Sequence, residues 1–209
     1  MTKRNVVCLG RQAASGGHEV GKRLAKKLGW AFYDQSLLEM AARRGNITLE
    51  KLEAADERRS NPWLFEAIHE GNENVGKGLS PSDALFQLHT QLIPELALDG
   101  GCVFVGRCAD YILRQAGIPH FSIFINAPFE ERLKRKMKLE GMEERETAAL
   151  LHRMDKDRKG YYDYYTGGGW GRPENYDFCI NSFHYGMDGT ADLIAALVGW
   201  EGDKTPFVD

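Results

Sequence analysis

Residues 6–22 read VVCLGRQAASGGHEVGK, and this stretch decides the fold. It opens on the apolar run Val6 to Leu9, which is typical of a short buried strand, and then passes through a glycine-rich segment. Beyond that segment an apolar residue recurs at every fourth position from Val20 to Leu28, which predicts a helix from His18 that ends before Gly29. A strand, a glycine-rich loop and a helix therefore open the chain.

The same alternation of strand and helix continues along the chain. The expected strands are 6–9, 31–33, 102–105, 121–125 and 178–181. The expected helices are 18–28, 36–43, 49–58, 84–98, 109–115, 129–140, 144–162 and 190–198. Because helices separate the short apolar strands, we predict an α/β fold with a five-stranded parallel sheet that is covered on both faces.

The segment between the second and third strands differs from the rest. Residues 48–99 contain no pattern typical of a strand, and Ser80 to Asp83 is a helix-start signal. The glycine-rich stretch from Glu70 to Gly78 predicts a mobile loop. Since 209 residues suit one large domain, we interpret this segment as a helical insertion in a single domain over 1–209.

Composition narrows the possible classes of protein. Hydrophobic residues make up 43% of the chain and charged residues 27%, and no segment approaches the roughly 20 apolar residues of a membrane span. The apolar run after Met1 to Arg4 is too short for a secretory signal, so we expect a cytoplasmic protein. A net charge of −3 argues against a nucleic-acid partner, and four scattered cysteines suggest neither zinc nor disulfides.

Polar residues follow the end of each expected strand. They are Arg11 to Gly17, Asp34, Gly106-Arg107, Asn126 and Asn181-Ser182. The carboxyl ends of parallel strands meet at one edge of a sheet, and open α/β sheets bind their ligands there. The sequence therefore predicts a functional site at this edge.

The loop after the first strand has the chemistry of an anion site. In Ser15-Gly16-Gly17 the glycines allow backbone N–H groups to close on an anion at the positive end of the next helix. The side chains of Arg11, Ser15 and His18 would add donors. The alternative is a tight strand-to-helix turn without a ligand, and this segment alone leaves both interpretations open.

The loop departs from the Walker A motif. Gly16 to Lys22 has the spacing G-x-x-x-x-G-K, but an arginine follows where Ser or Thr would hold magnesium. This register would also unwind Val20 to Leu24, which the apolar spacing requires as helix. We prefer the register in which Gly16 is the last loop glycine. Gly17 then stands at the position of the phosphate-binding lysine, and Glu19 at that of the hydroxyl.

A set of arginines is the second candidate feature. Its members are Arg107, Arg132, Arg135, Arg153 and Arg158. Guanidinium groups stabilise the charge that spreads over the equatorial oxygens in phosphoryl transfer. The alternative is a solvated helix with ion pairs, because Asp155 and Asp157 lie at helical spacing from Arg158 and Arg153.

Two other groups of residues give weaker indications. The histidines at 69, 89, 120, 152 and 184 share no metal-ligand spacing, so the metal ligands stay unknown. An aromatic group would either stack on a base or pack a lid segment. It contains Tyr161, Tyr162, Tyr164, Tyr165 and Trp170.

Taken together, five stretches carry a resemblance to a known family. They are Arg11 to Gly17, Phe32-Tyr33-Asp34, Val105 to Asp110, Phe124 to Pro128 with Arg132 and Arg135, and Met154 through Arg158, Tyr165 and Trp170 to Ser182. In this combination the chain resembles the cytidylate kinase-like family, a branch of the nucleoside monophosphate kinase group. The resemblance covers nearly the whole chain.

The resemblance implies a three-layer α/β/α P-loop-type fold with a core at 1–39, 100–154 and 173–209. A helical arm for the nucleoside monophosphate would lie at 40–99, and a lid at 155–172. It also implies ATP and Mg²⁺ as cofactors and a nucleotide or other small molecule as substrate.

The resemblance implies roles for single residues as well. Arg107 would grip the acceptor phosphate, with Asp34 and Asp110 beside the acceptor. Arg158, Asp155 and Asp157 would close over the transferred phosphoryl group. Arg132 and Arg135 would act from the helix that carries the lid, and Lys22 would reach the phosphates only by curling back from the helix.

Three hypotheses about function follow. The first is an ATP-dependent kinase acting on a nucleoside monophosphate or another small molecule. The second is an inert nucleotide- or anion-binding protein with a kinase fold, because Gly17 and Glu19 replace the standard lysine and hydroxyl. The third is a structural or interaction module, which buried pairing of Arg107 with Asp34 and no pocket nearby would favour.

Overall fold

The sheet has the predicted architecture. The structure is a computed structural model that describes residues 5–53, 56 and 78–199. Its strands are β1 (Val6–Arg11), β2 (Ala31–Tyr33), β3 (Cys102–Val105), β4 (Phe121–Asn126) and β5 (Phe178–Asn181). Neighbouring strands are all parallel, in the order β2-β3-β1-β4-β5, so the predicted five-stranded parallel sheet is confirmed.

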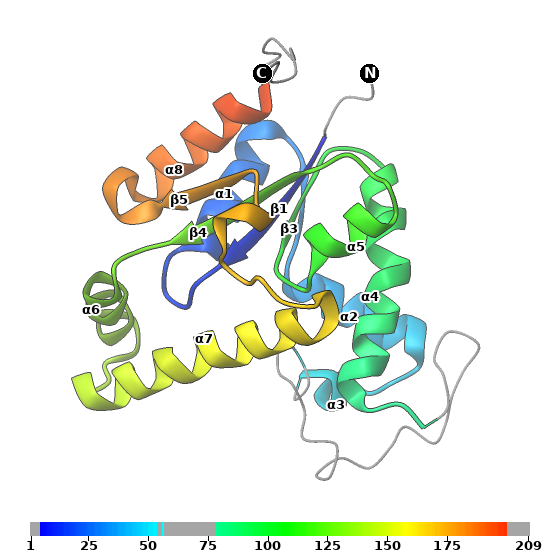
Figure 1. The fold of residues 1–209 in the computed structure, drawn as a ribbon, viewed down its shortest axis with the longest axis horizontal. Helices are drawn as coiled ribbons and strands as arrows, with labels where there is room; N and C mark the ends of the chain where they lie inside the picture. Colours follow the sequence, from blue (N-terminus) through cyan, green and yellow to red (C-terminus); the bar gives the residue numbers. More distant parts are fainter. Residues whose placement is uncertain (1–4, 54–55, 57–77, 200–209) are drawn as a thin grey trace.

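Helices form the layers on both sides of this sheet. They are α1 (Gly17–Leu28), α2 (Gln35–Gly45), α3 (Leu49–Glu53), α4 (Pro81–Leu98), α5 (Ala109–Gln115), α6 (Phe129–Glu140), α7 (Glu144–Thr166), the short 3-10 helix η1 (Pro173–Asn175) and α8 (Ser182–Gly199). Figure 1 shows α7 running from α6 towards the end of α4, beyond one end of the strands. In the described part of the chain, no helix combines the length and apolar character that a membrane span requires.

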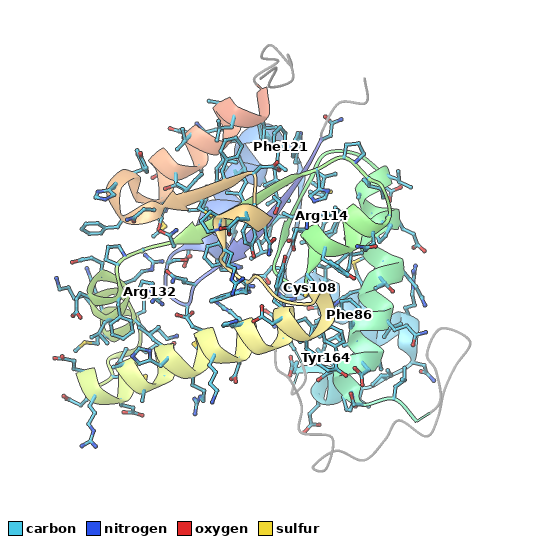
Figure 2. The ribbon with its side chains drawn as sticks, viewed as in Figure 1. Phe86, Cys108, Arg114, Phe121, Arg132 and Tyr164 are labelled. Atoms are coloured by element: carbon cyan, nitrogen blue, oxygen red, sulfur yellow. The ribbon has the colours of Figure 1, made fainter. Side chains whose placement is uncertain are left out.

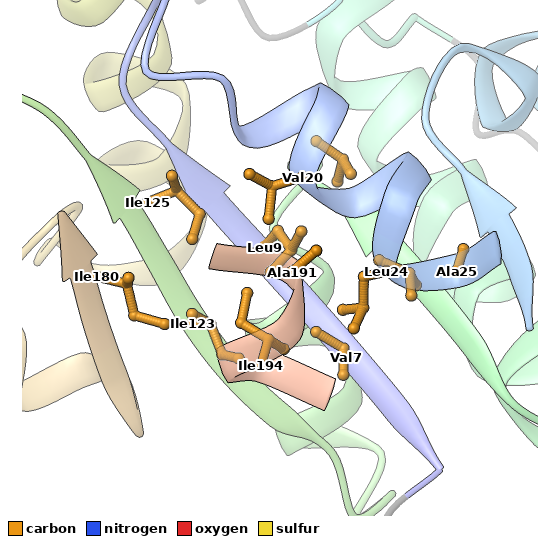
Figure 3. Close-up of a cluster of buried hydrophobic side chains, with 12 residues drawn as sticks. Val7, Leu9, Val20, Leu24, Ala25, Ile123, Ile125, Ile180, Ala191 and Ile194 are labelled. Carbon is orange, nitrogen blue, oxygen red and sulfur yellow. The ribbon is translucent and has the colours of Figure 1, made fainter. Parts of the chain in front are cut away.

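The alternation of side chains along β1 assigns the two faces of the sheet. Val7 and Leu9 point to one face, where they pack with Val20 and Leu24 of α1 and with Ile194 of α8 (Figure 3). These side chains are at most 1% exposed. The four-residue spacing on α1 thus buries a single stripe of the helix against the sheet.

The residues between them in β1 face the opposite layer. Val6 and Cys8 pack with Phe104 of β3 and with Ile93 and Leu113 from α4 and α5. Since both faces of the strands are buried, β1 is apolar at nearly every position, as expected for a central parallel strand. This packing holds the carboxyl ends of β1 and β3 side by side.

Some element boundaries differ from the sequence prediction. Helix α7 continues four residues further, to Thr166, and ends at Gly167, whose φ of 83° suits glycine. The last helix begins at Ser182 instead of Thr190, with a non-helical kink at Gly186. The second half of the expected helix 49–58, apart from Asp56, and the expected loop 70–78, apart from Gly78, lie outside the described residues.

Candidate functional site

The ends of the strands come together as predicted, and the backbone there takes unusual conformations. Ala14, Arg107 and Cys108 have φ values of 55–57°, in the left-handed region that side chains other than glycine seldom adopt. Ala14 lies in the loop after β1, and the other two residues follow β3. Such conformations persist only where surrounding contacts hold them, and they cluster at functional sites.

An ion pair from two helices holds the loop. Arg132 on α6 donates from Nη1 to Oδ2 of Asp155 on α7 at 2.7 Å. The same side chains bind both backbone groups of Ala13, whose N–H donates to Asp155 Oδ1 at 2.7 Å and whose C=O accepts from Arg132 Nη1 at 3.1 Å. Arg132 Nε also donates to the carbonyl of Ala127 at 3.1 Å. Both predicted catalytic residues therefore contact the loop backbone.

Further hydrogen bonds hold the middle of the loop. The Ser15 hydroxyl donates to the carbonyl of Gln12 at 2.9 Å. The hydroxyl of Ser182, at the start of α8, lies 2.6 Å from the Ser15 carbonyl and 3.1 Å from that of Asn126. The Ser15 carbonyl is thus held by the start of α8, and the Gln12 carbonyl by the loop itself.

The backbone N–H groups at the start of α1 are arranged differently. Among the residues that the structure describes, none accepts a hydrogen bond from the N–H of Gly16, Gly17 or His18. Gly16 has a φ of 83° and caps the helix. Donors left open at the positive end of a helix are the groups that bind phosphate in other proteins. The loop thus keeps the N–H donors that the predicted anion cradle requires, although Gly16 and Gly17 are themselves buried and only His18 is exposed.

The structure explains why the loop lacks a lysine. A Cβ atom on Gly17 would lie 2.6 Å from the Cβ atom of Arg11, closer than real Cβ contacts come. The residues from Val20 to Leu24 are helical, so the preferred register is confirmed. Lys22 is exposed on the second turn of α1, and Arg11 is buried at the end of β1.

The buried Arg107 pairs with Asp34, whose side chain is 12% exposed. Arg107, which is 4% exposed, donates from Nη1 to Oδ1 of Asp34 and to the Val105 carbonyl, and from Nη2 to Oδ2 of Asp56 at 2.7 Å. The other oxygen of Asp34, Oδ2, lies 2.5 Å from Nδ1 of His18. One carboxylate therefore links the residue after β3 to the first turn of α1.

A small cavity lies beside this cluster. Its volume is about 20 Å³, which is room for about one water molecule. Its polar walls include Arg11, Arg107, Asp110 and Arg158. Arg158 reaches from α7 to the carbonyl of Arg11 at 3.4 Å. The pairing of Arg107 with Asp34, one of the two conditions set for a purely structural module, is therefore present, and it lies next to a cavity of only this size.

Asp110 stands at the back of the cavity in an apolar setting. The hydroxyl of Tyr162 donates to its Oδ2 at 2.7 Å. Burial raises the pKa of Asp110 and also raises the pKa of Tyr162. Desolvation is the leading cause for both groups because it disfavours their charged forms.

A larger groove lies on the other side of the loop. Its volume is about 510 Å³, and Ala14 and Ser15 form the wall nearest to the loop. Helix α6 contributes Arg135 and Leu139, and the start of α8 contributes Phe183, which is 51% exposed. This volume is in the range of small-molecule sites.

Arg135 and Asp157 are the remaining residues that were predicted to be catalytic. Arg135 donates from Nη2 to Oε1 of Glu19 at 2.9 Å, and both side chains are partly exposed. The side chain of Asp157, half-buried on α7, has no hydrogen-bond or ion-pair partner among the described residues. The structure therefore brings Arg135 to the loop and gives Asp157 no contact of this kind.

The aromatic group divides between two places. Tyr161, Tyr162 and Trp170 line the small cavity, and Tyr165 packs the junction between α7 and α4. Phe86 stacks on Tyr165 with ring centroids 4.0 Å apart, and the Tyr165 hydroxyl donates to Oδ1 of Asp83 at 2.8 Å. Figure 2 shows Phe86 near the end of α7 that lies farthest from Arg132. Contacts at both ends thus hold α7 across the strand ends, and the packing interpretation of these aromatic residues fits.

Sequence reasoning missed several residues of the site. Asp56 lies in the insertion, where no pattern marked it, and His18 was expected to bind phosphate and not to contact Asp34. Phe183 directly follows the quoted pair Asn181-Ser182, so the next position after that strand was the available signal.

Comparisons with known proteins agree with this architecture. A model of the cytidylate kinase-like family matches residues 6–184. A cytidylate kinase from Thermococcus kodakarensis is 30% identical over 125 residues, which are 54% of this chain and 63% of that protein. The matched region thus spans less than two thirds of that relative.

Solved structures extend the comparison to the fold. A crystal structure of an uncharacterized protein from Eubacterium ventriosum has 25% identity and a TM-score of 0.66, with 93% of this chain and 98% of that chain covered. Shikimate kinase from Bacteroides thetaiotaomicron has 15% identity and a TM-score of 0.55 over the same shares, which shows a similar fold. The match over residues 6–184, together with the sheet and the loop, shows that the chain belongs to the cytidylate kinase-like family.

Proposed function

We propose that this protein is an ATP-dependent kinase that transfers a phosphoryl group to a nucleoside monophosphate or another small molecule. The observation that carries the proposal is the set of open N–H groups of Gly16, Gly17 and His18. They belong to a loop that Arg132 and Asp155 hold from outside. A rigid cradle of this kind binds phosphates without reorganising, as phosphoryl transfer requires.

The groove beside Ala14 and Ser15 suits the nucleoside part of ATP. The exposed ring of Phe183 offers a surface for stacking, and Lys138 adds a positive charge to the groove. Lys134 and Arg135 also line it, and they are paired with Glu131 and Glu19. The loop separates this groove from the small cavity at Arg11. A donor on one side and an acceptor on the other would meet at the cradle.

The cavity side supplies the charged groups for transfer. Arg11 and Arg158 lie on the same wall, with the Arg158 guanidinium against the end of β1. Arginines in this position stabilise negative charge on the transferred group. Because the cavity holds about 20 Å³, an acceptor would enter only after side chains that line it, such as Arg158, move aside.

Magnesium accompanies ATP in such reactions, but the described residues form no evident site for it. In the described residues, no three His, Cys, Asp or Glu side chains gather as metal ligands. Glu19, at the position of the usual hydroxyl, is paired with Arg135. We therefore expect Mg²⁺ to arrive on the nucleotide with its own water, and we assign no step to a protein-bound metal.

Calorimetry and an ADP-release assay test the proposal. We expect the wild-type chain to bind MgATP and to release ADP with at least one acceptor from a panel of nucleosides, monophosphates and small metabolites. Arg158→Ala should lower turnover far more than ATP affinity, because its guanidinium faces the cavity and not the groove. Arg153→Ala, an exposed position on the same helix, is the control. No ATP binding and no turnover with any acceptor would refute the proposal.

A second candidate is an inert nucleotide- or anion-binding protein. Two observations favour this candidate. There is no room for a lysine at Gly17, and both Arg132 and Arg135 are paired with carboxylates. It predicts saturable MgATP binding with no ADP release above the background of buffer. Release of ADP that depends on Arg158 would decide for the kinase.

A further inference from the structure

Three side chains on the β2–β3 side of the loop form a connected series. Arg107 binds Oδ1 of Asp34, and Oδ2 of Asp34 lies 2.5 Å from Nδ1 of His18. The side chain of Asp34 is 12% exposed, while that of His18 is 51% exposed. The partly buried carboxylate of Asp34 is thus held at both oxygens, and the exposed ring of His18 is at the end of the series.

This arrangement orients the imidazole of His18. Nδ1 faces Asp34, and the ring packs edge-on against Phe32 with centroids 5.4 Å apart. Among the described residues, nothing forms a hydrogen bond with Nε2. A buried carboxylate that holds Nδ1–H leaves Nε2 as a proton acceptor, which is how an Asp–His pair serves a general base.

The position of His18 is suited to the reaction. It directly follows Gly17, and its own N–H is one of the open donors of the cradle. Its side chain reaches towards the end of β2, where the cluster with Arg107 begins. An acceptor oxygen approaching a phosphoryl group at the cradle from this side would pass close to the ring.

The charges on this side disfavour a phosphate acceptor at Arg107. Both terminal nitrogens of Arg107 donate to carboxylates, one to Asp34 and one to Asp56. Two carboxylates therefore already balance the single positive charge of the guanidinium. A dianionic group would have to displace one of them to bind Arg107. Asp110 lies on the same cavity, where burial keeps its pKa high.

The chemistry of the acceptor separates two classes of substrate. The oxygen of a monophosphate is already ionised near neutral pH, so its attack requires no base. A hydroxyl has to lose a proton as it attacks, and a positioned base serves that need.

We propose that His18 is the general base for a hydroxyl-bearing acceptor, that Asp34 and Arg107 are its positioning residues, and that the substrate is an alcohol and not a monophosphate. The inference rests on the proposed kinase function. The acceptor oxygen forms a bond to the γ-phosphorus of ATP while the bond from that phosphorus to the β–γ bridging oxygen breaks. The bonding electrons leave with ADP, the hydroxyl proton moves to Nε2 of His18, and solvent later removes it.

The first experiment compares acceptors in matched pairs. ADP release from MgATP is measured with cytidine, uridine, adenosine and small polyols, and with CMP, UMP and AMP. We expect turnover with a hydroxyl compound and none above background with the monophosphates. A monophosphate as the preferred acceptor would overturn the inference and leave the kinase function intact. A wild-type chain that binds MgATP but transfers to no hydroxyl, water included, would also overturn it.

The second experiment uses water as the acceptor, so it requires no known substrate. His18→Ala should lower the kcat of MgATP hydrolysis by about 10²-fold, the usual contribution of a general base, with little change in the KM for ATP. Asp34→Asn should show the same split between kcat and KM. Added imidazole should restore part of the activity of His18→Ala, which a merely structural role would not allow.

His120→Gln is the matched control, because His120 lies before β4 at the opposite edge of the sheet. It should keep the wild-type kcat. Thermal melting of each variant identifies any loss of folding. Hydrolysis by a folded His18→Ala at the wild-type rate would refute the role of His18. If wild-type protein failed to bind ATP, the proposed function itself would fall, and the inference with it.

Discussion

The two sides of the loop between β1 and α1 are built differently. On the β2–β3 side the buried Arg107 pairs with Asp34 and Asp56 and lines a cavity of about 20 Å³. On the β4–β5 side a groove of about 510 Å³ is open, and its ion pair, Arg135 with Glu19, is partly exposed. Buried pairs fix geometry, whereas an open apolar groove accommodates a ligand. This difference is the basis of our proposal that the reacting groups lie on the first side and that the nucleotide binds on the second.

The largest expected effect comes from breaking the support that both sides share. Asp155→Ala removes the partner of Arg132, which is 5% exposed, and the acceptor of the Ala13 N–H. Leaving a buried charge without its partner costs about 3 kcal/mol, so we expect a loss of that size in the free energy of unfolding by urea. Asp157→Ala, two residues along the same helix, should change it by less than about 0.5 kcal/mol. Equal losses of stability in the two variants would contradict the role of Asp155 in holding the loop.

A second change acts on the cradle itself. The Cβ atom of Gly17→Ala would lie 2.6 Å from the Cβ atom of Arg11, so the loop or β1 has to shift. Overpacking of this kind costs about 1–3 kcal/mol, and we also expect weaker MgATP binding by calorimetry. Gly160→Ala, in α7 with no atom within 4 Å of the added Cβ, should keep ATP affinity and raise stability slightly. Unchanged ATP affinity in Gly17→Ala would count against the cradle.

Local sequence patterns predicted most of the sheet and the first helix. The strands were found within two residues because apolar runs between helices leave few alternatives, and the α1 register followed from the spacing of Val20 and Leu24. The early start of α8 was missed because the kink at Gly186 interrupts its pattern.

The pairing of side chains was not predictable in the same way. Arg132 and Asp155 were expected to face the transferred phosphate, and helical spacing offered Asp155 a partner on its own helix. The structure instead pairs them across two helices and onto Ala13. Such contacts depend on how α6 and α7 pack together, which no local pattern encodes.

The open side should be less sensitive than the buried side. Arg135→Ala removes an ion pair whose side chains are 30% and 43% exposed. We therefore expect the free energy of unfolding to fall by less than about 1 kcal/mol. A double-mutant cycle with Glu19→Ala isolates the coupling between the two residues. The coupling energy should weaken further in high salt. A coupling energy as large as that between Arg132 and Asp155 would contradict the expected difference between the two pairs.

The smallest expected change is in how the free energy of unfolding depends on pH. Burial raises the pKa of Asp110 above its unfolded value, so its stabilising contribution is complete below that value and is lost as pH rises through the folded pKa. Asp110→Asn keeps an acceptor for the Tyr162 hydroxyl and does not titrate. Between pH 4 and pH 7, the unfolding free energy of the wild type should therefore fall relative to the variant. A difference that stays constant with pH would contradict the buried position of Asp110.

Titration of backbone amides by ATP tests the central claim most directly. In two-dimensional ¹H–¹⁵N spectra, MgATP should shift the N–H signals of Gly16, Gly17 and His18 in a saturable manner, because these donors are open at the start of α1. The signals of the opposite edge, around His120, should not move. Saturable shifts there with none at Gly16 to His18, or no shifts at all, would contradict a phosphate cradle at this loop.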